Sequence, residues 1–297
     1  MLAAFELHRP ASIAEAASLL AACPDAALYA GGTELLLLMK AGLMRPADVI
    51  DIKRIPDLDG LVAGDDVLAI GATVTHRRLE RSPAVRARWP LVAGVVAHVA
   101  NVRVRNVGTV GGNLAFADPH SDIATLLLVF DATVHLASTA GTRELTLGDF
   151  VRGPYETARR SDEVLTGVRL PAWPAGTVGV YVKFGLHERP TLGVALTLTV
   201  DGDRRVSAAR LAVGCVSQRP HRIEAAERAL VGRPLEDPGE EFAALAAAAV
   251  DPVSDLHGGA DYKRELTRVF ARRALAAAVA RAEGRALDAR YPHAVIV

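Results

Sequence analysis

Residues 101–131 read NVRVRNVGTVGGNLAFADPHSDIATLLLVFD, and this stretch decides how the rest of the chain is interpreted. Gly111 and Gly112 lie at its centre. Adjacent glycines let the backbone approach a bulky ligand closely, because no Cβ stands in the way. Thr109 and Asn113 add short hydrogen-bonding side chains beside that backbone. The centre of the stretch therefore predicts half of a binding cradle for a cofactor.

The flanks of the stretch predict regular structure on both sides of the glycines. Arg103 and Arg105 alternate with apolar residues, which indicates a strand leading into the turn. Residues 123–130 form an apolar helical run. Asp122 occupies the expected N-cap of that helix, where its carboxylate can hold free helix amides or a ligand hydroxyl.

Composition bounds the possible functions. The chain has 297 residues, enough for two domains of about 100–200 residues each. Hydrophobic residues make up 51% of it, which allows a sizeable core. The 34 basic residues balance 34 acidic ones, so a nucleic-acid or strongly anionic membrane partner is not expected. Apolar runs such as residues 35–39 are far shorter than the ~20 residues that span a bilayer. No signal peptide is recognised, so we expect a soluble cytoplasmic protein.

The two cysteines, Cys23 and Cys215, are far apart in sequence. Such sparse use favours a reducing compartment over a disulfide scaffold. Two cysteines cannot by themselves bind an iron–sulfur cluster or a structural zinc ion. We expect no metal site and no iron–sulfur cluster in this chain.

A second glycine turn lies near the N-terminus. Residues 27–30 predict a short buried strand, Gly31 and Gly32 turn out of it, and residues 34–41 predict a helix. This order presents free backbone N–H groups to a phosphate. The turn matches neither G-x-G-x-x-G nor G-x-x-x-x-G-K-[ST], so the familiar nucleotide motifs are absent.

The remaining pattern predicts an α+β protein with a linker at residues 171–176, which contain two prolines and a glycine. Ser12 and Glu15 have capping-box spacing at a first helix. Other expected strands lie at 49–52, 61–63, 67–70, 133–136, 143–145, 163–170, 178–184, 192–200 and 206–213, and other expected helices at 84–100, 223–230, 240–250 and 262–282.

Several segments together resemble the FAD-binding subunit of the molybdenum hydroxylases. The group includes the medium subunit of aerobic carbon monoxide dehydrogenase and the flavin domain of xanthine dehydrogenase. The segments are YAGGTEL (29–35), IGATVTH (70–76), GTVGGN (108–113), DPHSD (118–122), ADYKR (260–264) and RRAL (272–275). The resemblance covers essentially the whole chain.

The resemblance implies a fold of the vanillyl-alcohol-oxidase/PCMH type. We expect an FAD-binding domain at residues 1–175, made of two subdomains split near 55–60. A C-terminal α+β domain of three strands and helices is expected at 176–297.

Carried over residue by residue, the resemblance implies a set of FAD contacts: Leu28, Tyr29, Ala30, Gly31, Gly32, Thr33, Glu34, Leu35, Thr109, Gly111, Gly112, Asn113, Asp122, Leu165 and Lys183. The first turn would wrap the pyrophosphate, and the second would line the diphosphate and ribityl chain. Asp122 would accept a hydrogen bond from a ribityl or ribose hydroxyl. Leu165 would touch the adenine or flavin region. Lys183 would lie near the flavin, where a cation stabilises an anionic reduced ring.

The resemblance also implies partners. Electrons would arrive from a large molybdopterin subunit through a small [2Fe–2S] subunit and leave to a quinone, NAD or oxygen, in a dimer of heterotrimers. No catalytic side chain is expected in this chain. The sequence does not choose the substrate of the molybdenum site; carbon monoxide, aldehydes, purines and N-heterocycles are all oxidised by relatives.

Other interpretations stay open from the residues alone. A self-sufficient flavin-dependent alcohol oxidase of the same fold, or a non-catalytic scaffold, would share these patterns. Asp122 also suits a pure N-cap, and Lys183 a solvated strand face. Thr109 and Asn113 also suit ordinary turn residues. The roles of Arg103, Arg105, His76 and His120 are undecided; a helix-start hydrogen bond is the commoner role at His76, and an exposed loop position at His120.

Overall fold

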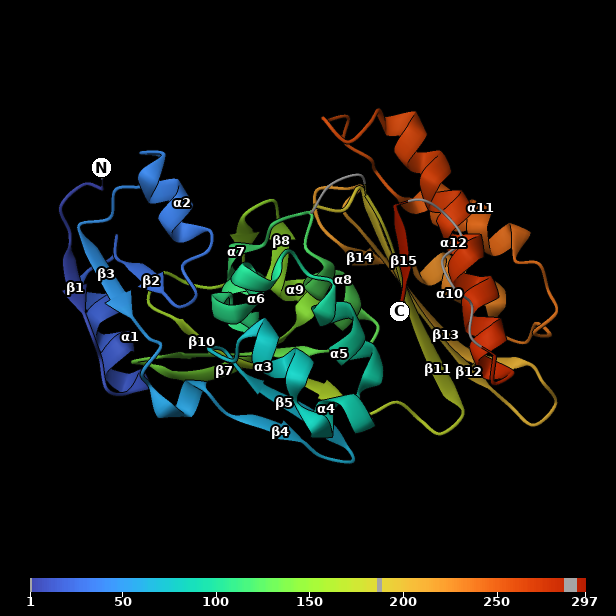
Figure 1. Cartoon of the computed structure of the whole chain (residues 1–297), viewed down its shortest axis with the longest axis horizontal. Coiled ribbons are helices and arrows are strands. Elements are labelled where there is room, and N and C mark those ends of the chain that lie inside the picture. The colour runs from blue at the N-terminus through green and yellow to red at the C-terminus, as the bar shows by residue number, and fades with distance from the viewer. Residues whose placement is uncertain (1, 186–188, 286–292) are drawn as a thin grey trace. The chain divides into compact units, whose positions relative to one another are not determined.

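The computed structural model describes residues 2–185, 189–285 and 293–297 (Figure 1). The chain divides into two compact units by its internal contacts. Unit 1 comprises Met1–Ala117 and Ala132–Pro171, and unit 2 comprises Asp118–Asp131 and Ala172–Val297. The sequence-based domain boundary at 175/176 and the subdomain split near 55–60 stay predictions.

The first sheet of unit 1 is small and parallel. Its strands are β1 (Glu6–His8), β3 (Asp48–Asp51) and β2 (Ala27–Tyr29), in the order β1-β3-β2. Helix α1 (Ile13–Ala22) precedes β2, and its Ala16 and Leu20 share a core with Ile50 of β3. The Ser12 hydroxyl accepts a hydrogen bond from the Glu15 amide at 3.1 Å, which confirms the expected cap. Helix α2 (Leu35–Lys40) follows β2, and a short 3₁₀ turn, η1 (Pro56–Leu58), follows β3.

The second sheet of unit 1 has five antiparallel strands in the order β4-β5-β10-β6-β7. Its bounds are β4 (Leu61–Ala63), β5 (Val67–Gly71), β10 (Val164–Pro171), β6 (Thr133–Ser138) and β7 (Gly141–Thr146). The expected hairpin of β4 and β5 is present. Strand β10 is the last of these in sequence but the middle one in space. Helix α9 (Leu147–Phe150) and the short strands β8 (Val151–Gly153) and β9 (Glu156–Thr157) connect β7 to β10.

Five short helices follow β5, and here two sequence-based expectations are wrong. They are α3 (His76–Arg81), α4 (Pro83–Arg88), α5 (Pro90–Ala97), α6 (Val102–Val107) and α7 (Val110–Phe116). The approach to the glycines is the helix α6, not a strand. The single helix expected over 84–100 is broken at Trp89, because Pro90 has no amide proton to continue the ladder and starts a new helix instead.

Unit 2 is built on an antiparallel sheet in the order β14-β13-β12-β11-β15. Its bounds are β11 (Thr177–Phe184), β12 (Leu192–Val200), β13 (Val206–Gly214), β14 (His221–Arg222) and β15 (Ala294–Ile296). Three strands were expected. The two short edge strands were missed because two or three residues carry no detectable alternation.

Helices cover both faces of this sheet. Helices α10 (Glu224–Leu230), α11 (Glu240–Ala249) and α12 (Ala260–Ala282) gather on one side, where Phe270 of α12 shares a core with Val180 and Val194 (Figure 1). Helix α8 (Asp122–Leu128) packs on β12 and β13, and all seven of its residues are buried. Coverage of both faces explains why β11 and β12 read as nearly continuous apolar runs.

No helix within the described ranges is both long enough and apolar enough to cross a membrane.

Candidate functional site

The first glycine turn, in unit 1, offers unused main-chain donors. It runs from the end of β2 to the start of α2, and Gly32 adopts a φ of +70°, which favours glycine. In the part of the chain that the structure describes, the backbone amides of Gly31, Gly32 and Thr33 have no protein acceptor. Unpaired amides in a tight turn are suited to binding the oxygens of an anion.

The second turn differs, because its amides are already paired. The Thr109 hydroxyl caps α7 by accepting from the Gly112 amide at 3.0 Å. The Val110 and Gly111 amides donate to the carbonyls of Val74 and Ala72, both at 3.0 Å. The amide of Asn113 donates to the Thr109 carbonyl at 2.9 Å. This turn could therefore contact a ligand through its surface and its side chains, but its amides are not available as donors.

The two turns are in contact, as the sequence led us to expect. A Cβ added to Gly31 would lie 2.3 Å from the carbonyl oxygen of Val107 and 2.7 Å from Cα of Gly108. A Cβ on Gly108 would lie 3.6 Å from the methyl group of Thr33. Gly111 packs equally closely on Ala72, where a Cβ would lie 2.6 Å from that residue's Cβ. Glycine is therefore required for the backbones to meet, and folding brings segments distant in sequence into one place.

His76 lies directly behind the second turn. Its amide donates to the Gly108 carbonyl at 3.0 Å, and its ring is only 3% exposed. Nδ1 is buried without a hydrogen-bond partner in the described structure. Burial, and then the positive charge of Arg105, lower the pKa of His76 from 6.5 to about 4. The ring is neutral at physiological pH and acts as packing beneath Gly108.

A buried carboxylate joins α3 to α6. Glu80 accepts from Arg77 at 2.6 Å and from Arg105 at 3.1 Å. Burial alone would raise the pKa of Glu80. The hydrogen bonds and charges of the two arginines together outweigh this effect, so the pKa lies below its usual value. Arg105 also donates to the carbonyls of Val99 and Ala100. Arg105, whose role the sequence left open, thus holds in place the helix that ends at Gly108.

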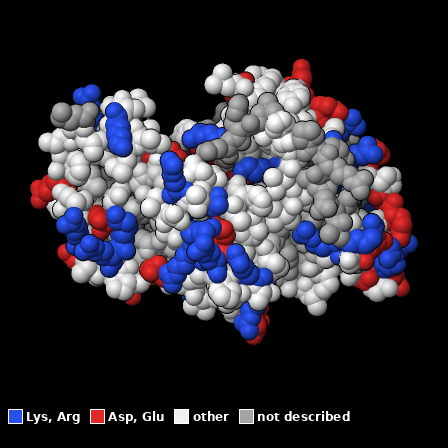
Figure 2. All heavy atoms as spheres, in the orientation of Figure 1, with Lys and Arg blue, Asp and Glu red and all other residues white. Residues whose placement is uncertain are grey.

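Positive charge gathers near this turn. Figure 2 shows Lys and Arg side chains grouped over α3 and α4, and α3 carries Arg77, Arg78 and Arg81. These arginines and Thr75 line a hollow of about 610 Å³. Thr75 is also bridged to Thr109 of the second turn. Arg77 is paired with Glu80 and Arg78 with Asp59, so carboxylates already balance the charge of two of these three arginines.

Leu165 is also in unit 1 and lies in β10, beside a β-bulge between Leu165 and Gly167. It pairs with Leu136 of β6 and is buried. The Ala72 amide donates to the Thr166 carbonyl at 3.0 Å, which ties this strand to the segment behind the second turn. The predicted contact of Leu165 with a ligand stays a prediction.

In unit 2, two more of the predicted site residues meet. Nζ of Lys183 donates to Oδ2 of Asp122 at 2.6 Å, and the Tyr181 hydroxyl donates to Oδ1 at 2.8 Å. The side chains of Asp122 and Lys183 are only 4% and 12% exposed. The alternative of a solvated Lys183 is therefore wrong. Ser121, not Asp122, is the N-cap of α8, and Asp122 is its first helical residue.

Tyr181 was missed by the sequence analysis. It precedes Lys183 by two residues on the same face of β11, and a partner 59 residues from Asp122 leaves no local signal. Burial, and then the charge of Asp122, raise the pKa of Tyr181 well above its usual value. Burial and Asp122 likewise raise the pKa of the Cys215 thiol. The tyrosine therefore stays a donor, and the cysteine stays a protonated thiol.

His120 is half-buried in unit 2, so its interpretation as an exposed loop histidine is wrong. Nδ1 of its ring lies 2.8 Å from the carbonyl oxygen of Pro190. Its ring centroid lies 4.7 Å from that of His257, and Nε2 lies 3.8 Å from Asp255. These contacts fix the loop before α8.

Comparisons with known proteins agree along the whole chain. Residues 3–173 match the family described as FAD binding domain in molybdopterin dehydrogenase, and residues 187–278 match the CO dehydrogenase flavoprotein C-terminal domain. The carbon monoxide dehydrogenase medium chain of Hydrogenophaga pseudoflava is 36% identical, over 93% of this chain and 98% of that relative. The nicotine 6-hydroxylase medium subunit of Paenarthrobacter nicotinovorans is 35% identical, over 94% and 99%.

Solved structures give the same result. A chain of carbon monoxide dehydrogenase from Hydrogenophaga pseudoflava superposes with a TM-score of 0.90 at 37% identity, covering 95% of this chain and 99% of that one. A chain of quinoline 2-oxidoreductase from Pseudomonas putida 86 gives a TM-score of 0.89 at 33% identity, with the same coverage.

Proposed function

Because this chain belongs to the family of FAD-binding subunits of molybdopterin dehydrogenases, we propose that it passes electrons from the [2Fe–2S] clusters of a small subunit to an external acceptor. The chain is the flavoprotein, or medium, subunit of a molybdenum hydroxylase of the carbon monoxide dehydrogenase and xanthine dehydrogenase type. The comparisons confirm the expected cofactor, FAD. They also confirm the expected combination of an FAD-binding domain with a C-terminal domain of helices and sheet.

The contact between the glycine turns carries the proposal for the binding site. FAD's diphosphate is doubly negative, and among the described residues the amides of Gly31, Gly32 and Thr33 have no protein acceptor. The residues present therefore fit the cofactor. The first turn would hold the diphosphate. The exposed backbone at Gly112 would leave room for the ribityl chain of FAD, which follows the diphosphate. When bound, FAD supplies the one- and two-electron chemistry.

Asp122 and Lys183 keep their proposed roles toward the cofactor. A carboxylate has about four lone-pair directions, so we propose that Asp122 accepts a cofactor hydroxyl while it also accepts from Lys183 and Tyr181. Its pairing with Lys183 and Tyr181 fixes its orientation in advance. We place Lys183 near the flavin, where its charge would favour the reduced state.

We further propose that the complex contains a large molybdopterin subunit, forms a dimer of heterotrimers and works in the cytoplasm. Similar relatives are themselves named as medium chains or subunits. The free state of both cysteines in this chain is consistent with a reducing compartment. The acceptor is proposed as a quinone, NAD or oxygen.

Reconstitution tests the proposal. The apoprotein should take up one FAD per chain, and the native complex should contain molybdenum and iron in addition to FAD. Stopped-flow reduction of the flavin by substrate should require the other two subunits. A chain that takes up no FAD, or that oxidises alcohols steadily when isolated, would contradict it.

A further inference from the structure

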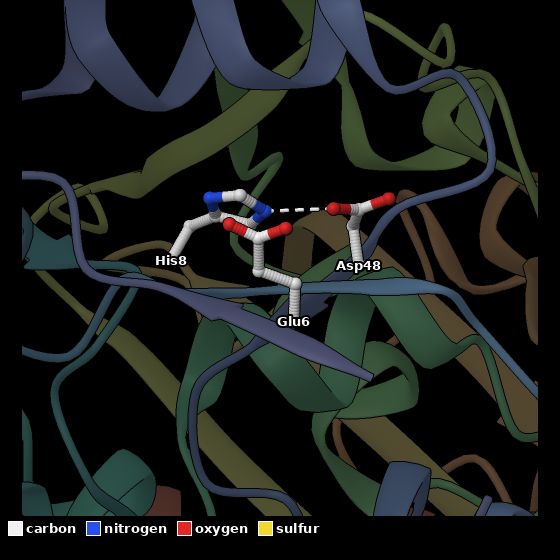
Figure 3. A group of neighbouring side chains, drawn as sticks. All are labelled: Glu6, His8 and Asp48. Atoms are coloured by element: carbon white, nitrogen blue, oxygen red, sulfur yellow. Dashed lines mark hydrogen bonds and ion pairs between the residues drawn. The ribbon is translucent and has the colours of Figure 1, made fainter. Parts of the chain in front are cut away.

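Three metal-binding side chains meet on the first sheet of unit 1, away from both glycine turns. Strands β1 and β3 run parallel, and Glu6 is in register with Asp48 while His8 is in register with Ile50. Glu6 and His8 are two residues apart, so they point to the same face of β1. Figure 3 shows the imidazole of His8 and the two carboxylates converging on one point above these strands.

The donor atoms are already close together. Nε2 of His8 lies 2.7 Å from Oδ1 of Asp48. One ligand atom from each of Glu6, His8 and Asp48 lies within 4.8 Å of the others. The side chains of His8 and Asp48 are 19% and 25% exposed, while Glu6 is exposed. A solvent ion can therefore reach the group, and the Glu6 side chain is free to adjust its position.

The imidazole of His8, which is charged only when protonated, is the basic group that the described structure places against these carboxylates. Two carboxylates lie opposite each other on neighbouring strands, and like charges in this position repel. Within residues 2–185, 189–285 and 293–297, no Lys or Arg forms an ion pair with Glu6 or with Asp48. A divalent ion would neutralise both carboxylates and bind the imidazole at once.

We propose that Glu6, His8 and Asp48 bind one divalent transition-metal ion, with Zn²⁺ as the probe, which clips β1 to β3. This departs from the sequence-based expectation of no metal site, because that expectation considered only cysteine ligands. One imidazole with two carboxylates suits Zn²⁺ and its first-row neighbours, whereas Mg²⁺ and Ca²⁺ prefer oxygen ligands alone. Donors of a tetrahedral Zn²⁺ site lie about 3.4 Å apart. The His8–Asp48 pair, at 2.7 Å, must therefore open, and a pair at the 4.8 Å limit must close by about 1.4 Å.

Equilibrium dialysis of the FAD-loaded chain against Zn²⁺, followed by metal analysis, tests the proposal. We expect one Zn²⁺ per chain, and at least a tenfold weaker affinity in each of Glu6→Gln, His8→Gln and Asp48→Asn. His135→Gln is the matched control, because among the described residues His135 forms an ion pair with a single carboxylate, Glu144, at 3.5 Å. Unchanged affinity in His8→Gln, or no bound Zn²⁺ at about 0.1 mM free metal, would overturn the proposal.

The FAD content of each variant separates this proposal from the proposed function. All three variants should keep one FAD per chain, since Glu6 and His8 lie on β1 and Asp48 at the start of β3, whereas the cradle follows the end of β2. X-ray absorption of the Zn²⁺-loaded wild type gives a measurement that needs no variant. It should show nitrogen and oxygen ligands only; a sulfur ligand would place the ion on a cysteine such as Cys23 and refute the assignment.

Discussion

At Gly31 one methyl group is enough to separate the two turns. A Cβ there would overlap the backbone of Val107 and Gly108, and backbone atoms cannot move aside as a side-chain end can. Gly31→Ala should therefore weaken FAD binding at least tenfold, about 1.4 kcal/mol, as measured by flavin fluorescence titration. Gly60→Ala is the control, because a Cβ at Gly60 meets nothing within 4 Å. Equal affinities in the two variants would disprove the role of the contact.

His76 makes stability depend on pH in a definite direction. Its pKa is about 4 in the folded chain and about 6.5 when unfolded, so between these values only the unfolded chain takes up the proton. Stability should fall as the pH drops from 6.5 toward 4, by about 3 kcal/mol from this group. Urea unfolding of His76→Gln should lack that part of the pH dependence, while His98→Gln, at an exposed position, should retain it. Identical pH profiles of stability for the wild type and His76→Gln would show that His76 does not cause this pH dependence.

The Asp122–Lys183 pair is buried, so breaking one side should be costly. Lys183→Met removes the cation that faces a buried carboxylate and should destabilise the chain by about 3 kcal/mol or more. Adding Asp122→Asn should recover at least about 1 kcal/mol in a double-mutant cycle. Arg228→Met removes an exposed pair with Glu224 and should change stability by no more than about 0.5 kcal/mol. Strict additivity of the Asp122 and Lys183 changes would show that the pair is not coupled.

At this scale the sequence singled out the glycines of the two turns, but not how the polar side chains pair with one another. The glycines could be predicted because close approach leaves only one residue type possible. The contacts of Tyr181 with Asp122 and of Glu80 with Arg105 could not, because these partners lie 59 and 25 residues apart and the sequence does not show which polar side chains are buried.

Among the elements, α6 decides where the second turn lies. Glu80 links it to α3 through Arg77 and Arg105. Glu80→Gln removes the charge that both guanidinium groups face, so we expect a loss of about 1–3 kcal/mol in the free energy of unfolding, together with weaker FAD binding.

The control for this change is Glu144→Gln on β7, whose carboxylate is largely exposed. It should leave both measurements unchanged. If Glu80→Gln lowers stability but binds FAD as tightly as the wild type, α6 does not position the turn.

The elements that the sequence predicted well are those with a long, clean period. Strands β10 to β13 and helix α12 were found almost to their ends. Helix α6 was mistaken for a strand because Val102, Arg103, Val104 and Arg105 alternate. Its start is instead set by Asn101, whose side chain accepts from the amides of Arg103 and Val104.

For the molecule as a whole, FAD should be part of the folded structure's stability. A ligand that binds only the folded state stabilises it by about 2.7 kcal/mol when present at 100 times its Kd. Stripping FAD should therefore lower the melting temperature, and adding it back should restore the transition in a concentration-dependent way. Differential scanning calorimetry of the apo and reloaded chain measures this. A melting temperature indifferent to FAD would mean that the cofactor is not bound to the folded state.

The path of the chain between its units has a consequence for synthesis. It leaves unit 1 after Ala117, contributes α8 to unit 2, returns at Ala132 and leaves again after Pro171. During translation α8 therefore emerges from the ribosome well before strands β12 and β13 on which it packs. The end of β13 at Gly214 lies 86 residues beyond Leu128, so the apolar side chains of α8 stay uncovered while that segment is made. We expect a chaperone to bind the nascent chain in that interval. A protein truncated after Pro171 would lack β12 and β13, so α8 would have no sheet to pack on.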